Sequence, residues 1–281
     1  MPGPLVTFTN DDMRFDVLDQ GPETGEVIVA LHGFPQLSSC WDAVTPTLTG
    51  AGYRVLAPDQ RGYSPGARPA KAKDYRLDLL GGDVLALADA AGADRVHLLG
   101  HDWGAAVAWY LASRRADRVR SLSVVSTPHP RALIKALRGR QLLMSWYMPV
   151  LQLPWVPEVT LRSRNAALTR RLLGRSGMPT IRQDEAAALL VEPGAATATL
   201  NWYRAMRTRH APGPGHVAVP TLYVWGDHDV ALGRRAADYT AEWVTGPYRF
   251  EILKGASHWI PDERPRELAN MVLAQVLRHN G

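Results

Sequence analysis

The chain has 281 residues, of which 46% are hydrophobic and 21% are charged, and its formal net charge is +5. These values fit a globular protein with a sizeable core and exclude a disordered or fibrous chain. The single cysteine, Cys40, excludes an internal disulfide and a site built from several thiolates. The start has no basic segment followed by an apolar one, and no uncharged apolar run is long enough for a membrane span. We therefore expect a cytoplasmic protein.

Predicted strands alternate with predicted helices in the first part of the chain. Apolar runs bounded by turn residues predict strands at 6–8, 14–18, 27–31, 55–57, 96–99 and 122–125. Apolar residues at helical spacing predict helices at 41–51, 74–91 and from 105 onward, and Gly92 is a signal for a helix end. This alternation indicates a mostly parallel, doubly wound α/β sheet whose first two strands form an antiparallel hairpin.

The alternation stops at residues 127–130, and the chain to residue 216 reads as helices broken by prolines, ending in a Gly- and Pro-rich loop at 211–215. Strands resume at 221–225 and 248–253, with helices at 236–243 and near the end. We therefore divide the chain into a core of residues 1–128 and 217–281 and a helical lid of residues 129–216. Such an insertion is expected over the carboxyl edge of the sheet, where open α/β folds bind ligands.

The most informative stretch is 96–104, VHLLGHDWG, in which a buried strand runs into a helix through Gly-x-Asp-x-Gly. This is the pattern of a nucleophile elbow, whose glycines permit a sharp turn that holds the middle side chain out at the sheet edge. Here the middle residue is Asp102. An alternative is that Asp102 only caps the helix by accepting backbone N–H bonds.

Two later loops complete a possible triad. Asp229 follows the strand at 221–225, and His258 follows the strand at 248–253, so the chain order is nucleophile, acid, histidine. Asp227 is a second candidate acid, but Asp229 fits the Gly-x-x-Asp spacing. An aspartate is ionised at pH 7 and can attack an sp³ carbon without a base, whereas serine would favour acyl transfer. Hydrolysis of the resulting ester needs a base, and a histidine polarised by a carboxylate suits that step.

These residues lie within motifs that resemble the α/β-hydrolase superfamily and, within it, the soluble epoxide hydrolases, which are related to the haloalkane dehalogenases. The matching motifs span almost the whole chain: HGFP at 32–35, RGY at 61–63, GHDWG at 100–104, LNWYR at 200–204, GDHD at 226–229 and SHW at 257–259. HGFP and GHDWG are shared with dehalogenases, and LNWYR is more selective. The resemblance implies that Asp102 forms an alkyl–enzyme ester and that His258, oriented by Asp229, activates the water that hydrolyses it.

The resemblance also assigns roles in binding and in acid catalysis. Tyr203 in LNWYR and Tyr147 in SWYMPVLQLPW match the two lid tyrosines that hydrogen-bond the epoxide oxygen. The backbone amides of Phe34 and Trp103 match the oxyanion hole. We expect the side chains of Trp103, Phe34 and Trp146 to contact the substrate. No dinucleotide fingerprint or metal-ligand spacing is present, so we expect no cofactor and no metal.

Two other functions stay open. A haloalkane dehalogenase would use the same aspartate and would hold halide with Trp103 plus a second N–H donor, for which Trp146, Trp155 and Trp202 are candidates. The side chain of Phe34 offers no such donor. A catalytically silent ligand-binding protein on the same fold would usually lack a triad member, and none is missing.

Positive charge concentrates in residues 131–182, which contain ten Lys and Arg residues and one acid, Glu158. No nucleic-acid motif accompanies this charge, so we expect no nucleic-acid partner and no stable membrane insertion. The expected partners are a small hydrophobic substrate and water, in a monomer or homodimer. The lid also has apolar residues expected to form the pocket wall or mouth, namely Leu142, Met144, Trp146, Met148, Val150, Leu151 and Trp155.

Overall fold

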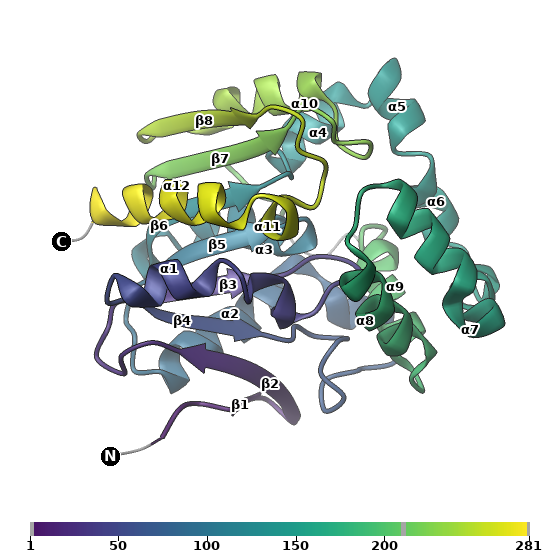
Figure 1. Ribbon diagram of the computed structural model, residues 1–281, viewed down its shortest axis with the longest axis horizontal. Coiled ribbons are helices and arrows are strands. Elements are labelled where there is room, and N and C mark those ends of the chain that lie inside the picture. Colours follow the sequence, from purple (N-terminus) through teal and green to yellow (C-terminus); the bar gives the residue numbers. More distant parts are fainter. Residues whose placement is uncertain (1–2, 209–211, 280–281) are drawn as a thin grey trace.

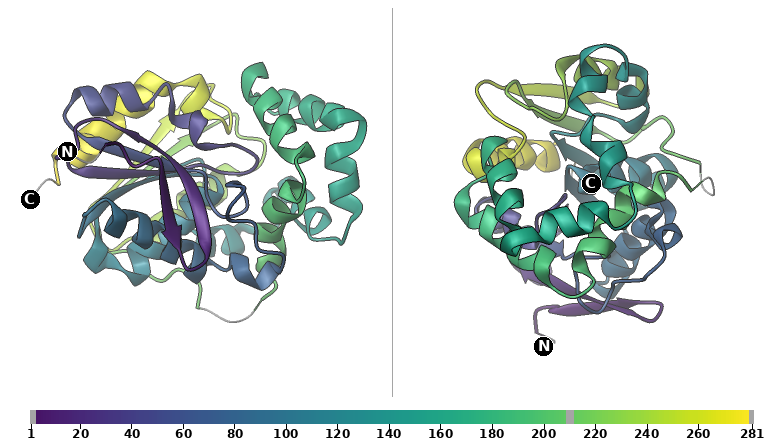
Figure 2. Two further views of the ribbon diagram at one scale, coloured as in Figure 1. Left: turned by 90° about the horizontal axis from the view of Figure 1, so that it is seen from below. Right: turned by 90° about the vertical axis from the view of Figure 1, so that its right-hand side faces the viewer.

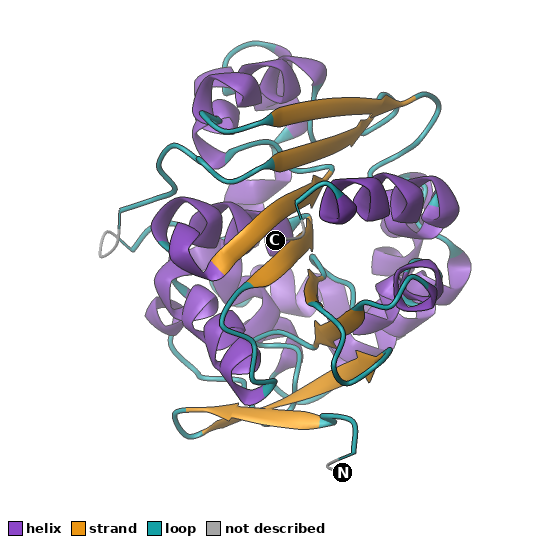
Figure 3. Ribbon diagram, turned by 90° about the vertical axis from the view of Figure 1, so that its left-hand side faces the viewer, coloured by secondary structure: helices purple, strands orange, loops and turns teal. Residues whose placement is uncertain are grey.

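A computed structural model describes residues 3–208 and 212–279 of the chain. Within these residues, eight strands form one sheet in the order β1-β2-β4-β3-β5-β6-β7-β8 (Figures 1 and 3). The strands are β1 (Thr7–Asn10), β2 (Met13–Gln20), β3 (Val27–Leu31), β4 (Arg54–Pro58), β5 (Val96–His101), β6 (Val119–Val125), β7 (Thr221–Gly226) and β8 (Tyr248–Leu253). Two pairs of strands are antiparallel, β1 with β2 and β2 with β4, and the other pairs are parallel. The predicted doubly wound, mostly parallel sheet is therefore confirmed.

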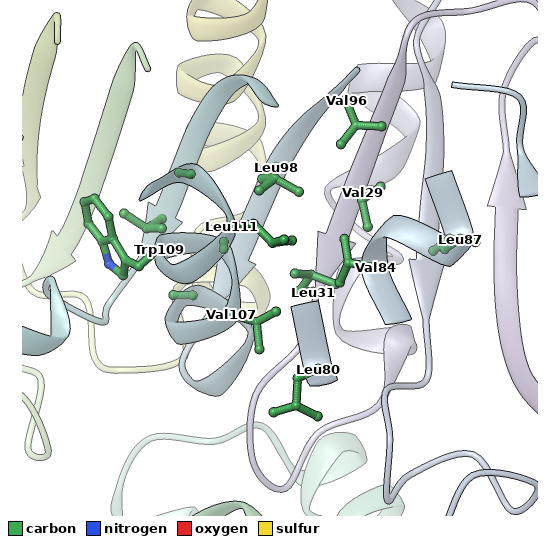
Figure 4. Packing of buried hydrophobic residues seen from close by; sticks show 14 of the residues in the cluster. Val29, Leu31, Leu80, Val84, Leu87, Val96, Leu98, Val107, Trp109 and Leu111 are labelled. Atoms are coloured by element: carbon green, nitrogen blue, oxygen red, sulfur yellow. The ribbon is translucent and has the colours of Figure 1, made fainter. Parts of the chain in front are cut away.

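Helices cover both faces of the sheet. On one face α2 (Leu77–Ala90), α3 (Trp103–Arg114) and α10 (Arg234–Tyr239) pack on the strands, and on the other face lie α1 (Thr45–Gly50), α11 (Ile260–Glu263) and α12 (Pro265–Leu277). Figure 4 shows Val84 of α2 and Leu111 of α3 gathered with Val29 and Leu98 of the sheet. All residues of β3, β4, β5 and β7 are buried, as expected for strands covered on both faces.

Some predicted helices are shorter than expected. The stretch 41–51 contains the last residue of a 3₁₀ turn (Ser38–Trp41) and then α1. Pro46 stands in the first turn of α1, where the missing N–H of proline costs no helical hydrogen bond. The stretch 74–91 begins with a 3₁₀ turn (Ala72–Tyr75) before α2, and Gly92 ends that helix with φ +71°. The stretch 236–243 is divided between α10 and a 3₁₀ turn.

Between β6 and β7 the regular elements of the described residues are helices, apart from one isolated bridge between Val217 and Val244. The helices are α4 (Pro130–Ala136), α5 (Arg140–Met144), α6 (Tyr147–Leu151), α7 (Val156–Arg175), α8 (Thr180–Val191) and α9 (Ala195–Ala205). Helix α7 is interrupted at residues 163–166, where the backbone leaves the helical region. Helices α5 to α9 stand beyond the carboxyl ends of the strands, whereas α4 packs on α10 (Figures 1 and 2).

The start of the predicted loop at 211–215 lies outside the described residues. The boundaries of the lid at 129 and 216 stay a prediction. None of the described helices combines the length and the apolar composition needed to cross a membrane.

Candidate active site

Asp102 stands at a strained turn between β5 and α3. Its backbone has φ 51° and ψ −118°, a conformation that costs a residue with a side chain about 1–3 kcal/mol. The carboxylate makes no capping bond to α3, so the structure argues against the interpretation of Asp102 as a simple helix cap. Instead, Oδ1 of Asp102 accepts a 2.7 Å hydrogen bond from the backbone N–H of Phe34. This contact is the arrangement expected for an oxyanion hole.

Glycines allow the loop after β3 and the start of α3 to approach this turn. A Cβ atom on Gly104 would lie 2.2 Å from the carbonyl oxygen of Leu31. A Cβ atom on Gly33 would lie 2.2 Å from Cβ of Asp102. No real Cβ contact is that short, so each position requires glycine. The elbow motif and the HGFP motif therefore depend on each other sterically.

His258 lies between two carboxylates. Its Nδ1 is 2.8 Å from Oδ2 of Asp229, and its Nε2 is 3.6 Å from Oδ2 of Asp102. The other oxygen of Asp229 accepts the backbone N–H groups of Ala231 and Leu232 at 2.7 and 2.9 Å, and the Asp229 side chain is fully buried. These contacts fix the carboxylate toward the imidazole. The structure therefore brings the three predicted triad residues together.

Asp227, the alternative acid, is exposed and is bonded to another loop residue. Its carboxylate accepts the backbone N–H of Gly255 at 2.6 Å. The Gly-x-x-Asp spacing therefore selects the right acid, because Asp229 contacts the imidazole of His258 and Asp227 contacts the backbone of Gly255.

The backbone of His258 is also held in place. Its carbonyl oxygen accepts hydrogen bonds from Oγ of Ser126, at 2.8 Å, and from Nε2 of His101, at 2.9 Å. Ser126 has φ +64°, and its own carbonyl accepts the hydroxyl of Tyr223 at 3.0 Å. Sequence reasoning missed Ser126. The available signal was its position directly after the strand predicted at 122–125, at the same sheet edge as Asp102.

The charges of the triad are strongly coupled. Burial lowers the pKa of His258, but Asp229 and Asp102 outweigh burial and raise this pKa to about 10. Burial also raises the pKa of Asp102, but the neighbouring His258 outweighs it and holds the pKa below its usual value. In contrast, burial lowers the pKa of His101 to about 4. These shifts favour a protonated His258 and a neutral His101 at neutral pH.

A cavity of about 270 Å³ reaches Asp102, and its walls are mainly apolar. The wall residues include Ala106, Leu133, Leu137, Met148 and Leu232, so α3 and α4 contribute as well as α6. Sequence reasoning missed most of this wall. Of the seven lid residues expected there, only Met148 lines the cavity.

Tyr147 on α6 and Tyr203 on α9 also line the cavity, with their ring centroids 6.5 Å apart. Burial raises the pKa of both hydroxyls, and the charge of Asp102 adds to the effect. Both tyrosines are therefore protonated over the whole neutral range and can donate. They line the same cavity as Asp102, although their helices are separated by more than forty residues of sequence.

The three side chains expected to contact substrate differ in position. Trp103 lines the cavity, and the ring of Tyr203 meets it edge to face at 5.1 Å. Phe34 does not line the cavity but packs edge to face on Tyr203 at 5.4 Å. Trp146 is 64% exposed and does not line the cavity, so its predicted contact with substrate is not supported. Successive helical residues point about 100° apart, and Tyr147 takes the inward direction.

No group of three or more metal-ligating side chains occurs in the part of the chain that the structure describes.

Comparisons with known proteins agree with this geometry. The family model for the alpha/beta hydrolase fold matches residues 26–265. The chain is 36% identical to the AB hydrolase superfamily protein YfhM of Bacillus subtilis, over 99% of this chain and 100% of that one. It is 32% identical to epoxide hydrolase A of Mycobacterium tuberculosis, over 93% of each chain. The crystal structure of epoxide hydrolase A from Mycobacterium thermoresistibile matches with a TM-score of 0.85 at 28% identity, over 96% of this chain and 97% of that one. The chain therefore belongs to the α/β-hydrolase superfamily and, within it, to the epoxide hydrolase-like proteins.

Proposed function

We propose that this protein hydrolyses apolar epoxides to vicinal diols through a covalent ester with Asp102. The observation that carries the proposal is the convergence of one carboxylate and two protonated tyrosines, Tyr147 and Tyr203, on a single apolar cavity. A carboxylate supplies the nucleophile for an sp³ carbon, and phenols supply the proton that an alkoxide leaving group requires. The relatives named as epoxide hydrolases support the same substrate class.

In the first step, Oδ2 of Asp102 attacks an epoxide carbon while the Phe34 amide holds Oδ1. The bond between that carbon and the epoxide oxygen breaks, and the oxygen keeps the electron pair and takes a proton from Tyr147 or Tyr203. The products are an alkyl ester on Asp102, a free hydroxyl on the substrate and a tyrosinate.

Ester formation then changes the role of His258. The ester is neutral, so one of the two carboxylates that raise the pKa of His258 is lost. The imidazolium releases its proton, which replaces the one that the tyrosine gave. The resulting neutral imidazole is a base, and Asp229 keeps its orientation through the 2.8 Å contact.

In the second step, His258 removes a proton from water, and the hydroxide attacks Cγ of Asp102. The Phe34 amide at Oδ1 stabilises the oxyanion. The Trp103 amide is suited to join it, because the first N–H groups of a helix have no intrahelical acceptor. The bond between Cγ and Oδ2 breaks, and Oδ2, which leaves as part of the diol, takes the proton from His258.

The structure disfavours a halide leaving group. A dehalogenase needs a second N–H donor beside Trp103, but Nε1 of Trp202 donates to the carbonyl of Arg61 at 2.8 Å. The other two candidates, Trp146 and Trp155, are 64% and 70% exposed and lie outside the cavity. A silent binding protein is disfavoured because the triad is complete.

The test is a single turnover in ¹⁸O-water with enzyme in excess over an aryl epoxide. Attack by Asp102 transfers carboxylate oxygen to the first diol, which is then unlabelled, and the label enters the protein. Labelled diol in the first turnover would mean direct attack by water and would rule out the ester. A parallel assay with a haloalkane should release no halide, and Asp102→Ala is the inactive control for both substrates.

A further inference from the structure

The net positive charge of the chain comes from residues 138–175, which contain α5, α6 and α7 and are here called the outer lid segment. It has seven arginines and one acid, a net charge of +6, whereas the whole chain has +5, so the remaining residues sum to −1. The acid, Glu158, pairs with Arg204, and Arg170 pairs with Asp184. The other six arginines are exposed and form no ion pair with any described residue, namely Arg138, Arg140, Arg162, Arg164, Arg171 and Arg175.

The same segment exposes large apolar side chains. Leu143 is 74% exposed and Trp155 is 70% exposed, and Leu142, Trp146 and Val159 exceed half exposure. Leu142 and Leu143 lie on α5 and Val159 on α7, and Trp146 and Trp155 directly precede α6 and α7. These three helices lie on the side of the molecule away from the sheet (Figures 1 and 2). Large exposed apolar side chains that are concentrated in one stretch of the chain, and not scattered singly, are typical of an interaction surface.

The combination of chemistry identifies one kind of partner. Arginine attracts anionic headgroups, while tryptophan and leucine enter the boundary between headgroups and acyl chains. Nucleic acid would use the arginines but gives no reason to expose Leu143 and Val159. A second copy of the chain would bring six unpaired arginines against six more. We propose that the outer lid segment docks reversibly on an anionic lipid surface.

Docking there would place the cavity mouth beside the lipid. Leu137, which immediately precedes the segment, lines the cavity, and so does Ile134, which is 67% exposed. The cavity therefore reaches the surface next to the outer lid segment. An apolar epoxide dissolved in the lipid would enter without crossing bulk water. This link to substrate rests on the proposed function, whereas the docking itself does not.

The test is co-sedimentation of the full chain with vesicles. We use phosphatidylcholine alone and an equal mixture of phosphatidylcholine and phosphatidylglycerol. The protein should bind the mixed vesicles and not the neutral ones, and binding should fall at about 1 M salt, where the screening length is about 3 Å. Arg138→Gln with Arg140→Gln should lower the partition coefficient about 30-fold.

Leu143→Ala with Trp155→Ala should lower partitioning by a similar factor through the loss of apolar contact. The matched control is Arg266→Gln with Arg278→Gln on and after α12, which removes two other exposed arginines without described ion pairs and should change partitioning less than roughly two-fold. Absence of binding, equal binding to both vesicles, or an equal loss in the control would overturn the proposal. So would a dimer in solution that the Leu143 and Trp155 changes dissociate. Vesicle binding needs no catalysis, so a chain that binds but does not turn over epoxide would overturn only the proposed function.

Discussion

Protonation of His258 should make part of the stability of this protein depend on pH. Burial lowers its pKa, but Asp229 and Asp102 raise it from 6.5 to about 10. Because the folded-state pKa is the higher one, this stabilisation is fully present below pH 6.5 and is lost as the pH rises through 10. The gap between the two values corresponds to about 5 kcal/mol at full size. His258 is only 5% exposed, so solvent screens the interaction little.

The assay is urea unfolding of the wild type and of His258→Gln near pH 6 and near pH 10. Titrating groups outside the triad contribute equally to both proteins and cancel in the difference. The wild type should lose several kcal/mol relative to the variant between the two pH values. Asp102→Asn, which removes one of the two carboxylates, should show a smaller loss that occurs at lower pH. A difference that is the same at both pH values would mean that His258 is neutral at rest, and the charge change proposed for it would be wrong.

Three further outcomes are expected. Tyr147→Phe and Tyr203→Phe should each raise the barrier to epoxide opening by about 1–3 kcal/mol in single-turnover kinetics, and the double variant should open almost no epoxide. If the double variant opened epoxide at the wild-type rate, the two tyrosines would not be the acids. His258→Gln should form the ester but not hydrolyse it, so intact mass spectrometry should find protein heavier by one substrate, and an unmodified mass would contradict the covalent step. Gly104→Ala should destabilise folding by more than about 3 kcal/mol in urea unfolding, because its Cβ would meet the Leu31 carbonyl at 2.2 Å, whereas Gly82→Ala, whose Cβ lies 3.9 Å from its nearest neighbour, should be neutral or stabilising; equal effects would contradict the steric argument.

The sequence predicts the triad because the signals involved are local. Asp102 and Asp229 follow β5 and β7, which are buried along their whole length, and His258 follows β8, which is half-buried except at Leu253. The carboxyl ends of parallel strands share one edge of a sheet. Their meeting therefore needs only the strand assignments and the rule that the strands are parallel. The strand assignments are reliable here because β3, β5 and β7 are buried along their whole length, which makes their apolar runs unbroken.

Contacts between distant segments have no such local signal in the sequence. Ser126 holds the His258 carbonyl across 132 residues of sequence, and a serine after a strand has many other uses. Trp202 is a similar case, because its N–H is occupied by the carbonyl of Arg61, 141 residues away. Only the folded chain reveals that the indole of Trp202 has no donor left for a halide.

The inward-facing residues of the lid depend on where its short helices begin. Helix α6 has five residues, fewer than two turns, so its sequence has no apolar period from which an inward face can be predicted. Trp146 and Tyr147 are both aromatic neighbours, yet one is 64% exposed and the other lines the cavity. In the proposed reaction, the carboxylate at the elbow is suited to attack an sp³ carbon. The leaving group would then depend on the donors that line the cavity, and the hydroxyls of Tyr147 and Tyr203 suit an alkoxide.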